Sequence, residues 1–200
     1  MIVKDRMSSP AVTATPATRT KDALQTMYVR KIRRMPVVDD SGKLLGIVTQ
    51  RDLVEKGKAD TPVGTIMTRG PYTTAIDAPI VQAATLMRNL GVGAFPVLDH
   101  GQLAGIISES DIFDAFLELL GARRAGTRII VPVSNIGEGV VQVLKALAAT
   151  GAQLTGLTTV TERGRPAVIV TADERDPRDL VRALTNAGFD PTHISVQDAA

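Results

Sequence analysis

The sequence contains no cysteine, so the chain has neither disulfide bonds nor thiolate metal sites. No uninterrupted apolar run reaches the roughly 18 residues that a membrane-spanning helix needs. The first ten residues, MIVKDRMSSP, lack the apolar core of a signal peptide. We therefore expect a soluble, cytoplasmic protein with no membrane partner.

Aromatic residues and excess charge are also scarce. Aromatic residues make up only 3% of the chain while hydrophobic residues make up 44%, so the core must be aliphatic. The formal net charge of +2, from 23 basic and 21 acidic residues, creates no field that would favour nucleic acid. The 200 residues suffice for one large domain or two small ones.

One segment occurs twice. GIVTQRDL at residues 46–53 returns as GIISESDI at residues 105–112. An offset of 60 aligns the chain from Met7 with Met67 to Pro36 with Pro96, and a single-residue gap at Ser41 then changes the offset to 59. A duplicated unit with one gap in a turn explains this pattern.

Each copy shows the same succession of periodicities. A helical pattern, two strand patterns around a glycine turn, and a second helical pattern give the order α–β–β–α. An extended lead-in precedes each copy. The lead-ins are expected at 11–14 and 72–75, the helices at 21–31, 50–57, 79–90 and 109–122, and the strands at 35–39, 44–49, 95–99 and 103–108.

The remainder of the chain follows a different pattern. Strands are expected at 127–133, 153–162, 165–172 and 193–198, with helices at 138–152 and 177–188. The order β–α–β–β–α–β is that of a ferredoxin-like unit. The chain is thus predicted to be α+β, with domains at 1–61, 62–122 and 127–198 and a boundary near 122–126.

A hydroxyl and an aspartate recur at the same spacing, as Thr49 with Asp52 and Ser108 with Asp111. The structural interpretation is a capping box at the start of a helix. The functional interpretation uses the same geometry, because a helix N-terminus and a hydroxyl suit a phosphate and a carboxylate accepts from the two hydroxyls of a ribose. Both interpretations stay open.

The segments MPVVDDSGKLLGIVTQRDL and FPVLDHGQLAGIISESDI make the first 120 residues or so resemble a pair of CBS domains, also called a Bateman module. The resemblance implies two related clefts that bind adenine nucleotides as regulatory ligands, without a catalytic cofactor. It implies that Asp52 and Asp111 hold ribose and that Thr49 and Ser108 meet phosphate. It also places two lead-in residues, Thr13 and Thr73, near the base.

The two copies differ in charge around the motif. The first has Arg33 and Arg34 before its proline and Arg51 inside the motif, where the second has Gly93, Ala94 and Ser110. The second copy also has Glu109 where the first has Gln50, and phosphate prefers arginine and is repelled by glutamate. We expect the Thr49–Asp52 cleft to bind more tightly, although Arg33 and Arg34 are equally compatible with a solvated basic turn.

The last segment, about residues 127–198, resembles an ACT domain, a family that pairs between chains and often binds amino acids. It departs from the family's Asp-x-x-Gly turn, with Asn135 and Glu138 at those two positions. Amino-acid sensing and pure dimerisation both stay open. A CBS pair followed by an ACT domain resembles the AcuB-type acetoin-utilisation accessory family in its domain order.

No catalytic or metal-binding motif accompanies these features, and His100 and His193 are isolated in the sequence. We expect a regulatory, non-enzymatic protein that senses an adenine nucleotide and modulates a partner enzyme. The alternative is a structural assembly protein with vestigial clefts. The wide aliphatic stripe at residues 112–120 favours a homodimer.

Overall fold

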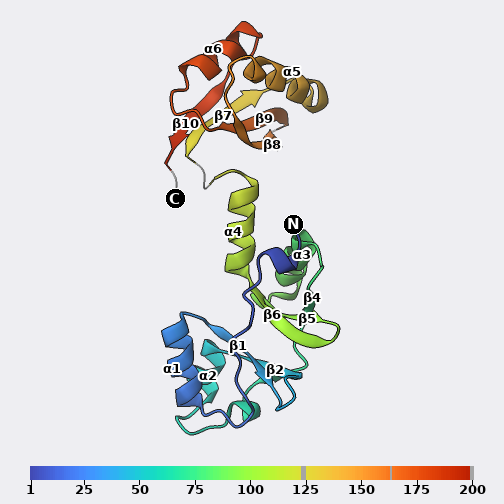
Figure 1. Ribbon diagram of the computed structural model, residues 1–200, viewed down its shortest axis with the longest axis vertical. Coiled ribbons are helices and arrows are strands. Elements are labelled where there is room, and N and C mark those ends of the chain that lie inside the picture. The colour runs from blue at the N-terminus through green and yellow to red at the C-terminus, as the bar shows by residue number, and fades with distance from the viewer. Residues whose placement is uncertain (123–124, 163, 199–200) are drawn as a thin grey trace. The chain divides into compact units, whose positions relative to one another are not determined.

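A computed structural model describes residues 1–122, 125–162 and 164–198, which divide into two compact units, Met1–Phe113 and Asp114–Ala200 (Figure 1). The predicted boundary near 122–126 includes residues 123–124, which lie outside the described residues. Within the described part of the chain, no helix is both long and apolar enough to cross a membrane.

The first copy has the predicted α–β–β–α order. It comprises α1 (Thr20–Arg30), β1 (Arg34–Val38), β2 (Leu44–Thr49) and α2 (Gln50–Lys56). The two strands form an antiparallel hairpin in which Pro36 lies opposite Ile47. The helices α1 and α2 pack side by side (Figure 1).

The second copy repeats this arrangement. It comprises β4 (Thr74–Ala75), α3 (Ile80–Leu90), β5 (Ala94–Asp99), β6 (Gln102–Ser108) and α4 (Glu109–Leu119). The extended lead-ins are confirmed, because Ala14 pairs in parallel with Val37 of β1 and Thr74 pairs in parallel with Val97 of β5. Short 3-10 turns, η1 (Val3–Asp5) and η2 (Val63–Thr65), occupy matching places before the two lead-ins.

The two copies exchange the segments that lie just before their lead-ins, which the sequence did not predict. The short strand β3 (Thr68–Arg69) precedes the second copy but pairs with β2 of the first. Ser8 precedes the first copy but pairs with Ile106 of the second, and its N–H donates to the Ile106 carbonyl at 2.9 Å. The exchange ties the two copies into one unit, so residues of both copies meet in the same clefts.

The core of the first copy is aliphatic, as expected from the composition. Fully buried members include Met27, Val37, Val48 and Leu53. Burying each such side chain contributes roughly 1.5–3 kcal/mol, which makes the sheet and the two helices a firm support for the residues at their ends.

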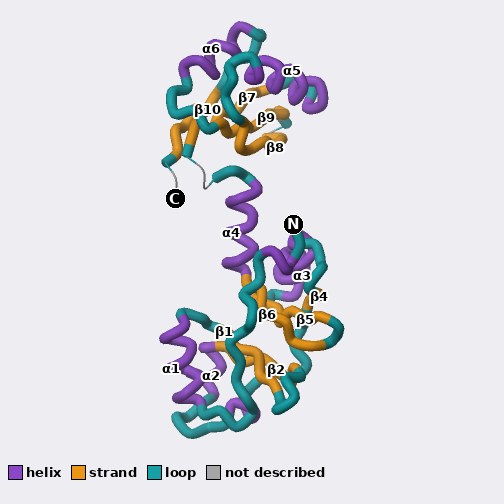
Figure 2. The backbone as a smooth tube through the Cα atoms, viewed as in Figure 1, coloured by secondary structure: helices purple, strands orange, loops and turns teal. Residues whose placement is uncertain are grey.

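The second unit has the predicted β–α–β–β–α–β order (Figure 2). Its elements are β7 (Gly126–Pro132), α5 (Ile136–Ala148), β8 (Leu154–Glu162), β9 (Arg165–Ala172), α6 (Arg178–Asn186) and β10 (Thr192–Gln197). The strands form one antiparallel sheet in the order β10-β7-β9-β8. Leu147 of α5 and Leu184 of α6 are buried in one core cluster with Val168 and Val170 of β9.

Candidate functional site

Both hydroxyl–aspartate motifs form a cap at the start of a helix. The Asp52 Oδ2 accepts from the Thr49 backbone N–H at 3.1 Å and from the Thr49 Oγ1 at 2.6 Å, while the Thr49 Oγ1 accepts from the Asp52 N–H. In the second copy the Asp111 Oδ2 accepts from the Ser108 N–H and Oγ, both at 2.7 Å. The capping interpretation is therefore confirmed, and each cap uses only one carboxylate oxygen.

The other carboxylate oxygen distinguishes the copies. The Asp52 Oδ1 accepts from the Lys56 Nζ at 2.6 Å. The pKa of Asp52 lies below its ordinary value because, although burial raises it, hydrogen bonds from Lys56 and Thr49 outweigh that effect. In the second copy the position of Lys56 is taken by the buried Ala115. Among the described residues, the Asp111 Oδ1 has no hydrogen-bond partner, which leaves it able to accept from a ligand.

Asp111 and Ser108 line a cavity of about 270 Å³, called here the Ser108 cleft. Its basic residues, Lys31, Arg33 and Arg34, come from the first copy. The other lining residues are Ser8, Ile32, Ala94, Ile106 and Ser110. The cleft thus brings three cations together with a hydroxyl and a carboxylate whose outer oxygen is free.

The sequence predicts Arg33 beside Thr49 and Asp52, but Arg33 lines the Ser108 cleft and not the cavity that Thr49 lines. The Arg33 carbonyl accepts from the Gln50 N–H at 2.8 Å, next to the first motif. The position of Arg33 in the sequence therefore did not predict which cavity it lines.

Thr49 lines a second cavity of about 340 Å³, called here the Thr49 cleft. Its other lining residues are Arg34, Ile47, Thr68, Gly70, Pro71, Tyr72, Gly91, Val92, Gly93 and Ala94. Gly91, Gly93 and Ala94 stand where the first copy has Lys31, Arg33 and Arg34. Arg34 is the one cation among these lining residues.

Arg34 and its counterpart Ala94 line both cavities. The Arg34 guanidinium lies so close to Gly93 that a Cβ there would be 2.0 Å from Arg34 Nη2. The same guanidinium forms an ion pair with Glu109, the first residue of α4, at 3.9 Å. Arg34 therefore reaches from the first copy to the start of the second copy's motif helix.

Four of the predicted site residues, Thr13, Asp52, Thr73 and Arg51, line neither of these two cavities. Thr13 and Thr73 are exposed on the lead-ins. The Arg51 Nε instead donates to Glu55 at 2.8 Å, and that hydrogen bond raises the pKa of Arg51.

The two clefts are also lined by residues outside the predicted set, namely Ser8, Lys31, Tyr72 and Ser110. For Lys31 a signal was present. It lies directly after a helix, at the position where the second copy has Gly91, and it has the left-handed backbone that glycine favours.

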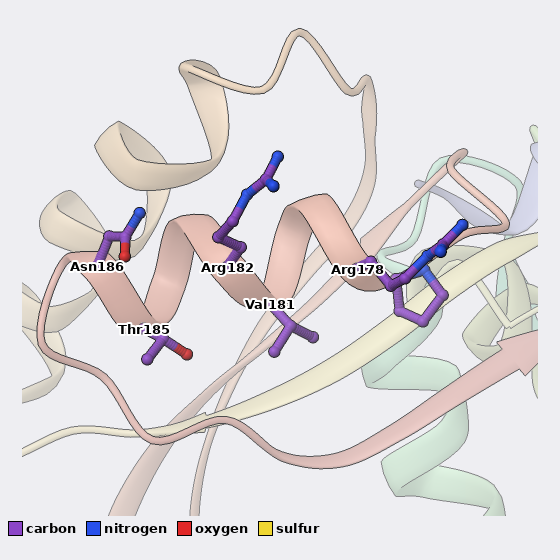
Figure 3. A pocket seen from close by; sticks show the side chains of 6 residues that line it. Arg178, Val181, Arg182, Thr185 and Asn186 are labelled. Atoms are coloured by element: carbon purple, nitrogen blue, oxygen red, sulfur yellow. The ribbon is translucent and has the colours of Figure 1, made fainter.

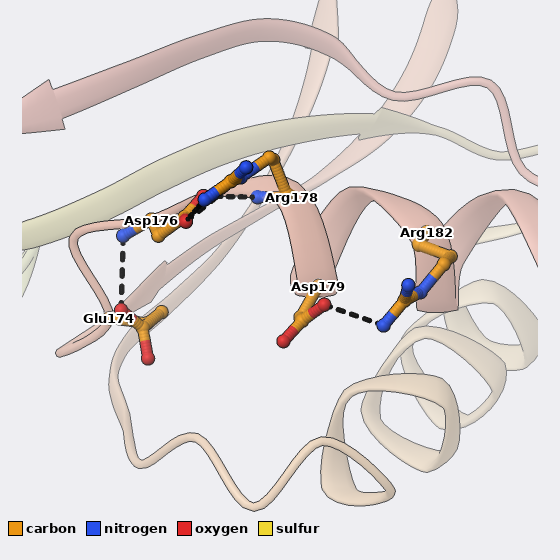
Figure 4. Close-up of polar contacts among 5 residues, drawn as sticks. All are labelled: Glu174, Asp176, Arg178, Asp179 and Arg182. Carbon is orange, nitrogen blue, oxygen red and sulfur yellow. Dashed lines mark hydrogen bonds and ion pairs between the residues drawn. The ribbon is translucent and has the colours of Figure 1, made fainter.

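The second unit has a shallow hollow on α6, lined by Arg178, Val181, Arg182, Thr185 and their neighbours (Figure 3). Val181 and Thr185 point to one side of the helix and Arg182 to the other (Figure 3). The two arginines are neutralised locally, because Arg178 binds the Asp176 carboxylate and the Arg182 Nη2 donates to Asp179 at 2.6 Å (Figure 4). Hydrogen bonds from Arg178 lower the pKa of Asp176 to about 2. This hollow lacks the unpaired cations of an anion site.

Near the start of α5, Asn135 acts as a helix cap, since its Oδ1 accepts from the Glu138 N–H at 3.1 Å. In the part of the chain that the structure describes, no group of three or more potential ligands among His, Cys, Asp and Glu could hold a metal ion. The candidate site lies in the two clefts of the first unit, because the repeated motif residues Thr49, Ser108 and Asp111 line them.

Comparison with known proteins identifies the repeat. The CBS domain family matches residues 3–58 and 63–118. A CBS domain-containing protein from Dictyostelium discoideum is 36% identical over 138 residues, which cover 60% of this chain and 94% of that protein. An inosine-5′-monophosphate dehydrogenase from Aquifex aeolicus is 30% identical, but the match covers 41% of that enzyme.

Solved structures show the same fold in the first unit. A CBS domain pair in complex with 5′-methylthioadenosine and S-adenosyl-L-methionine has a TM-score of 0.55 at 30% identity and is matched over 95% of its length and 58% of this chain. A candidate acetoin utilization protein (AcuB) from Vibrio cholerae has a TM-score of 0.56 at 32% identity, over 93% of its length and 60% of this chain. CBSX2 in complex with AMP has a TM-score of 0.54 at 25% identity, over 97% of its length and 59% of this chain.

Proposed function

The chain belongs to the CBS-domain family, and we propose that it is a regulatory protein that binds an adenine nucleotide in the Ser108 cleft. The single observation that carries this proposal is the composition of that cleft. Lys31, Arg33 and Arg34 of one copy line it together with Ser108 and Asp111 of the other.

Each group suits one part of a nucleotide. Guanidinium and ammonium groups bind phosphate oxygens by charge-assisted hydrogen bonds, and arginine adds bidentate geometry. The Ser108 hydroxyl supplies a further polar contact. The Asp111 Oδ1 accepts from the vicinal hydroxyls of a ribose, while the Asp111 Oδ2 keeps the helix cap intact. Two related structures hold adenosine derivatives, which supports the same ligand class here.

Regulation follows from the way the cleft is built. The walls of the cleft come from both copies, so a bound nucleotide stabilises one arrangement of the two copies over others. The free-energy difference equals the difference in the nucleotide's binding free energy between those arrangements. A partner enzyme that contacts this unit then responds to the nucleotide. We infer no catalysis by this chain, and the partial match to an enzyme is consistent with a regulatory module shared with it.

We further propose an ACT-type domain at residues 127–198, after CBS domains at 1–61 and 62–122. The sheet order β10-β7-β9-β8 is the order of a ferredoxin-like unit and supports this assignment. Asn135 is engaged in capping α5, so dimerisation is favoured over amino-acid sensing. The AcuB-like neighbour supports a role linked to acetoin utilisation.

Light scattering on the full chain should show a homodimer at micromolar concentration, and a monomer at that concentration would contradict the proposed dimerisation.

The test compares the two aspartates. Asp111→Ala removes an acceptor worth about 1.5–3 kcal/mol to a ribose hydroxyl, so calorimetry should show AMP binding weakened roughly tenfold to a hundredfold. Asp52→Ala is the matched control, because it removes the equivalent cap in the copy whose carboxylate already pairs with Lys56. Its AMP affinity should stay within about twofold of the unchanged protein. If Asp52→Ala weakened AMP binding as much as Asp111→Ala or more, the assignment of the nucleotide to the Ser108 cleft would be wrong. No binding of any adenine nucleotide would favour vestigial clefts and an assembly role.

A further inference from the structure

The second unit holds a cavity of about 650 Å³ at one end of its sheet, lined by residues of β7, β9 and β10. We infer that this cavity, called here the sheet-end cavity, binds a small monocarboxylate that has an apolar body and no ammonium group, such as a short branched-chain acid. The cavity lies outside both clefts of the first unit, so the inference does not depend on the proposed nucleotide binding.

The sheet-end cavity opens on the face of the sheet opposite α5 and α6. Val131 of β7 is buried in the core cluster that contains residues of both helices, so its neighbours Ile130 and Pro132 face the other way. Ala167 of β9 lies opposite Pro132 in register and shares that face. With Pro166 they give the cavity an apolar wall, against which a hydrocarbon group is favourably buried.

Two basic residues, Arg165 and His193, also line the sheet-end cavity, and none of the described residues that line it is acidic. Within the described part of the chain, neither of their side chains makes a hydrogen bond or an ion pair. By contrast, Arg128 of β7 is engaged, because its Nη1 donates to the Leu120 carbonyl at 3.2 Å. The cavity therefore offers an anion one permanent cation and one imidazole.

A bulge in β10 sets the position of His193. The pairing register between β10 and β7 shifts between Thr192 and Ser195, and His193 has a left-handed backbone with φ of 51°. This conformation is sterically unfavourable for a residue with a side chain. Bulges redirect side chains beside functional sites, and left-handed residues other than glycine cluster at such sites. The backbone thus holds an imidazole at the sheet-end cavity at a conformational cost.

A carboxylate with a hydrocarbon tail matches both sets of residues. A guanidinium binds a carboxylate through two parallel hydrogen bonds, and an imidazole N–H donates to an anion in either protonation state. Arg165 and Ala167 are two residues apart on β9 and share one face, so a ligand held by Arg165 can lay its tail on the apolar wall. An amino acid would bring its ammonium group beside the Arg165 guanidinium and find no carboxylate among the described lining residues.

NMR titration of the amide signals of the full chain can test the sheet-end cavity with three probes. They are isocaproate, its uncharged amide, and leucine, which is isocaproate with an added ammonium group. Isocaproate should bind with a Kd on the order of 1 mM and should shift the amide signals of Ile130, Ala167 and His193. The amide and leucine should each bind about tenfold more weakly, because the amide lacks the charge and leucine adds a repelled cation.

Variants separate the contributions of the two basic residues. Arg165→Gln should weaken isocaproate binding roughly fivefold to thirtyfold, whereas the matched control Arg182→Gln, on α6 outside this cavity, should change it less than about twofold. His193→Gly keeps a left-handed backbone accessible and removes the imidazole, so it should weaken binding about threefold to tenfold without lowering Tm.

Four outcomes would overturn the inference. They are leucine binding as tightly as isocaproate, the amide binding as tightly as isocaproate, equal losses in Arg165→Gln and Arg182→Gln, and no shift at the three amides with isocaproate at roughly fifty times the expected Kd. The titration contains no nucleotide, so a failure of the proposed nucleotide binding would leave its result unaffected.

Discussion

Lys31→Gly should stabilise the protein and weaken its nucleotide binding at the same time. Lys31 has a left-handed backbone with φ of 54° and ψ of 37°, and its counterpart Gly91 has φ of 63° and ψ of 29°. A left-handed residue other than glycine costs about 1–2 kcal/mol, and the greater flexibility of an unfolded glycine offsets about 0.5–1 kcal/mol of that. The variant should therefore gain roughly 0.5–1 kcal/mol, or about 1–4 °C in Tm.

The same substitution should lower the affinity of the protein for AMP. Loss of the Lys31 ammonium from the Ser108 cleft should weaken AMP binding by about 1–2 kcal/mol, or roughly fivefold to thirtyfold. Thermal unfolding without ligand and calorimetry with AMP measure the two effects separately. An unchanged AMP affinity would show that Lys31 has no part in the site, and a lower Tm would refute the conformational argument.

Three further predictions concern the charge, protonation and core of the first unit. Arg33→Ala should weaken AMP binding roughly tenfold to a hundredfold, while Arg51→Ala should leave calorimetric affinity unchanged; the reverse order would contradict the cleft assignment. Lys56→Met should raise the pKa of Asp52, measured by carboxylate NMR. Ionised Asp52 stabilises the fold above its unfolded pKa, and this stabilisation is lost as the pH falls through its folded pKa. The stabilisation should be smaller in Lys56→Met, so the free energies of unfolding of the variant and the unchanged protein should differ most near neutral pH and least in acid. Phe95→Ala, at a side chain only 1% exposed, should cost about 3–5 kcal/mol in denaturant unfolding, and a loss below about 1 kcal/mol would contradict its place in the core.

Much of the fold could be predicted because its signals are local. The duplicated α–β–β–α order follows from hydrophobic periodicity and from glycine turns, which act over a few residues. The capping geometry of Thr49 and Ser108 follows from a spacing of three residues. The pairing of Ser8 with Ile106 could not be predicted in this way, since it joins segments 98 residues apart.

The composition of the clefts was predictable only in part, for the same reason. The motif aspartate Asp111 could be identified from its own copy, but the basic residues that line the same cleft come from the other copy. The Arg33 carbonyl accepts from Gln50 of the first motif, yet Arg33 lines the cleft of the second motif, and a sequence pattern does not show which copy a residue will face. Comparison of Lys31 with Gly91 was the available clue, because a lysine at a position suited to glycine indicates a role other than folding.

A crystal structure of the full chain with AMP would show which cleft holds the nucleotide. We expect the phosphate beside Lys31, Arg33 and Arg34 and the ribose hydroxyls within hydrogen-bond distance of the Asp111 Oδ1. A phosphate bound in the Thr49 cleft, or a ribose held by Asp52, would contradict it.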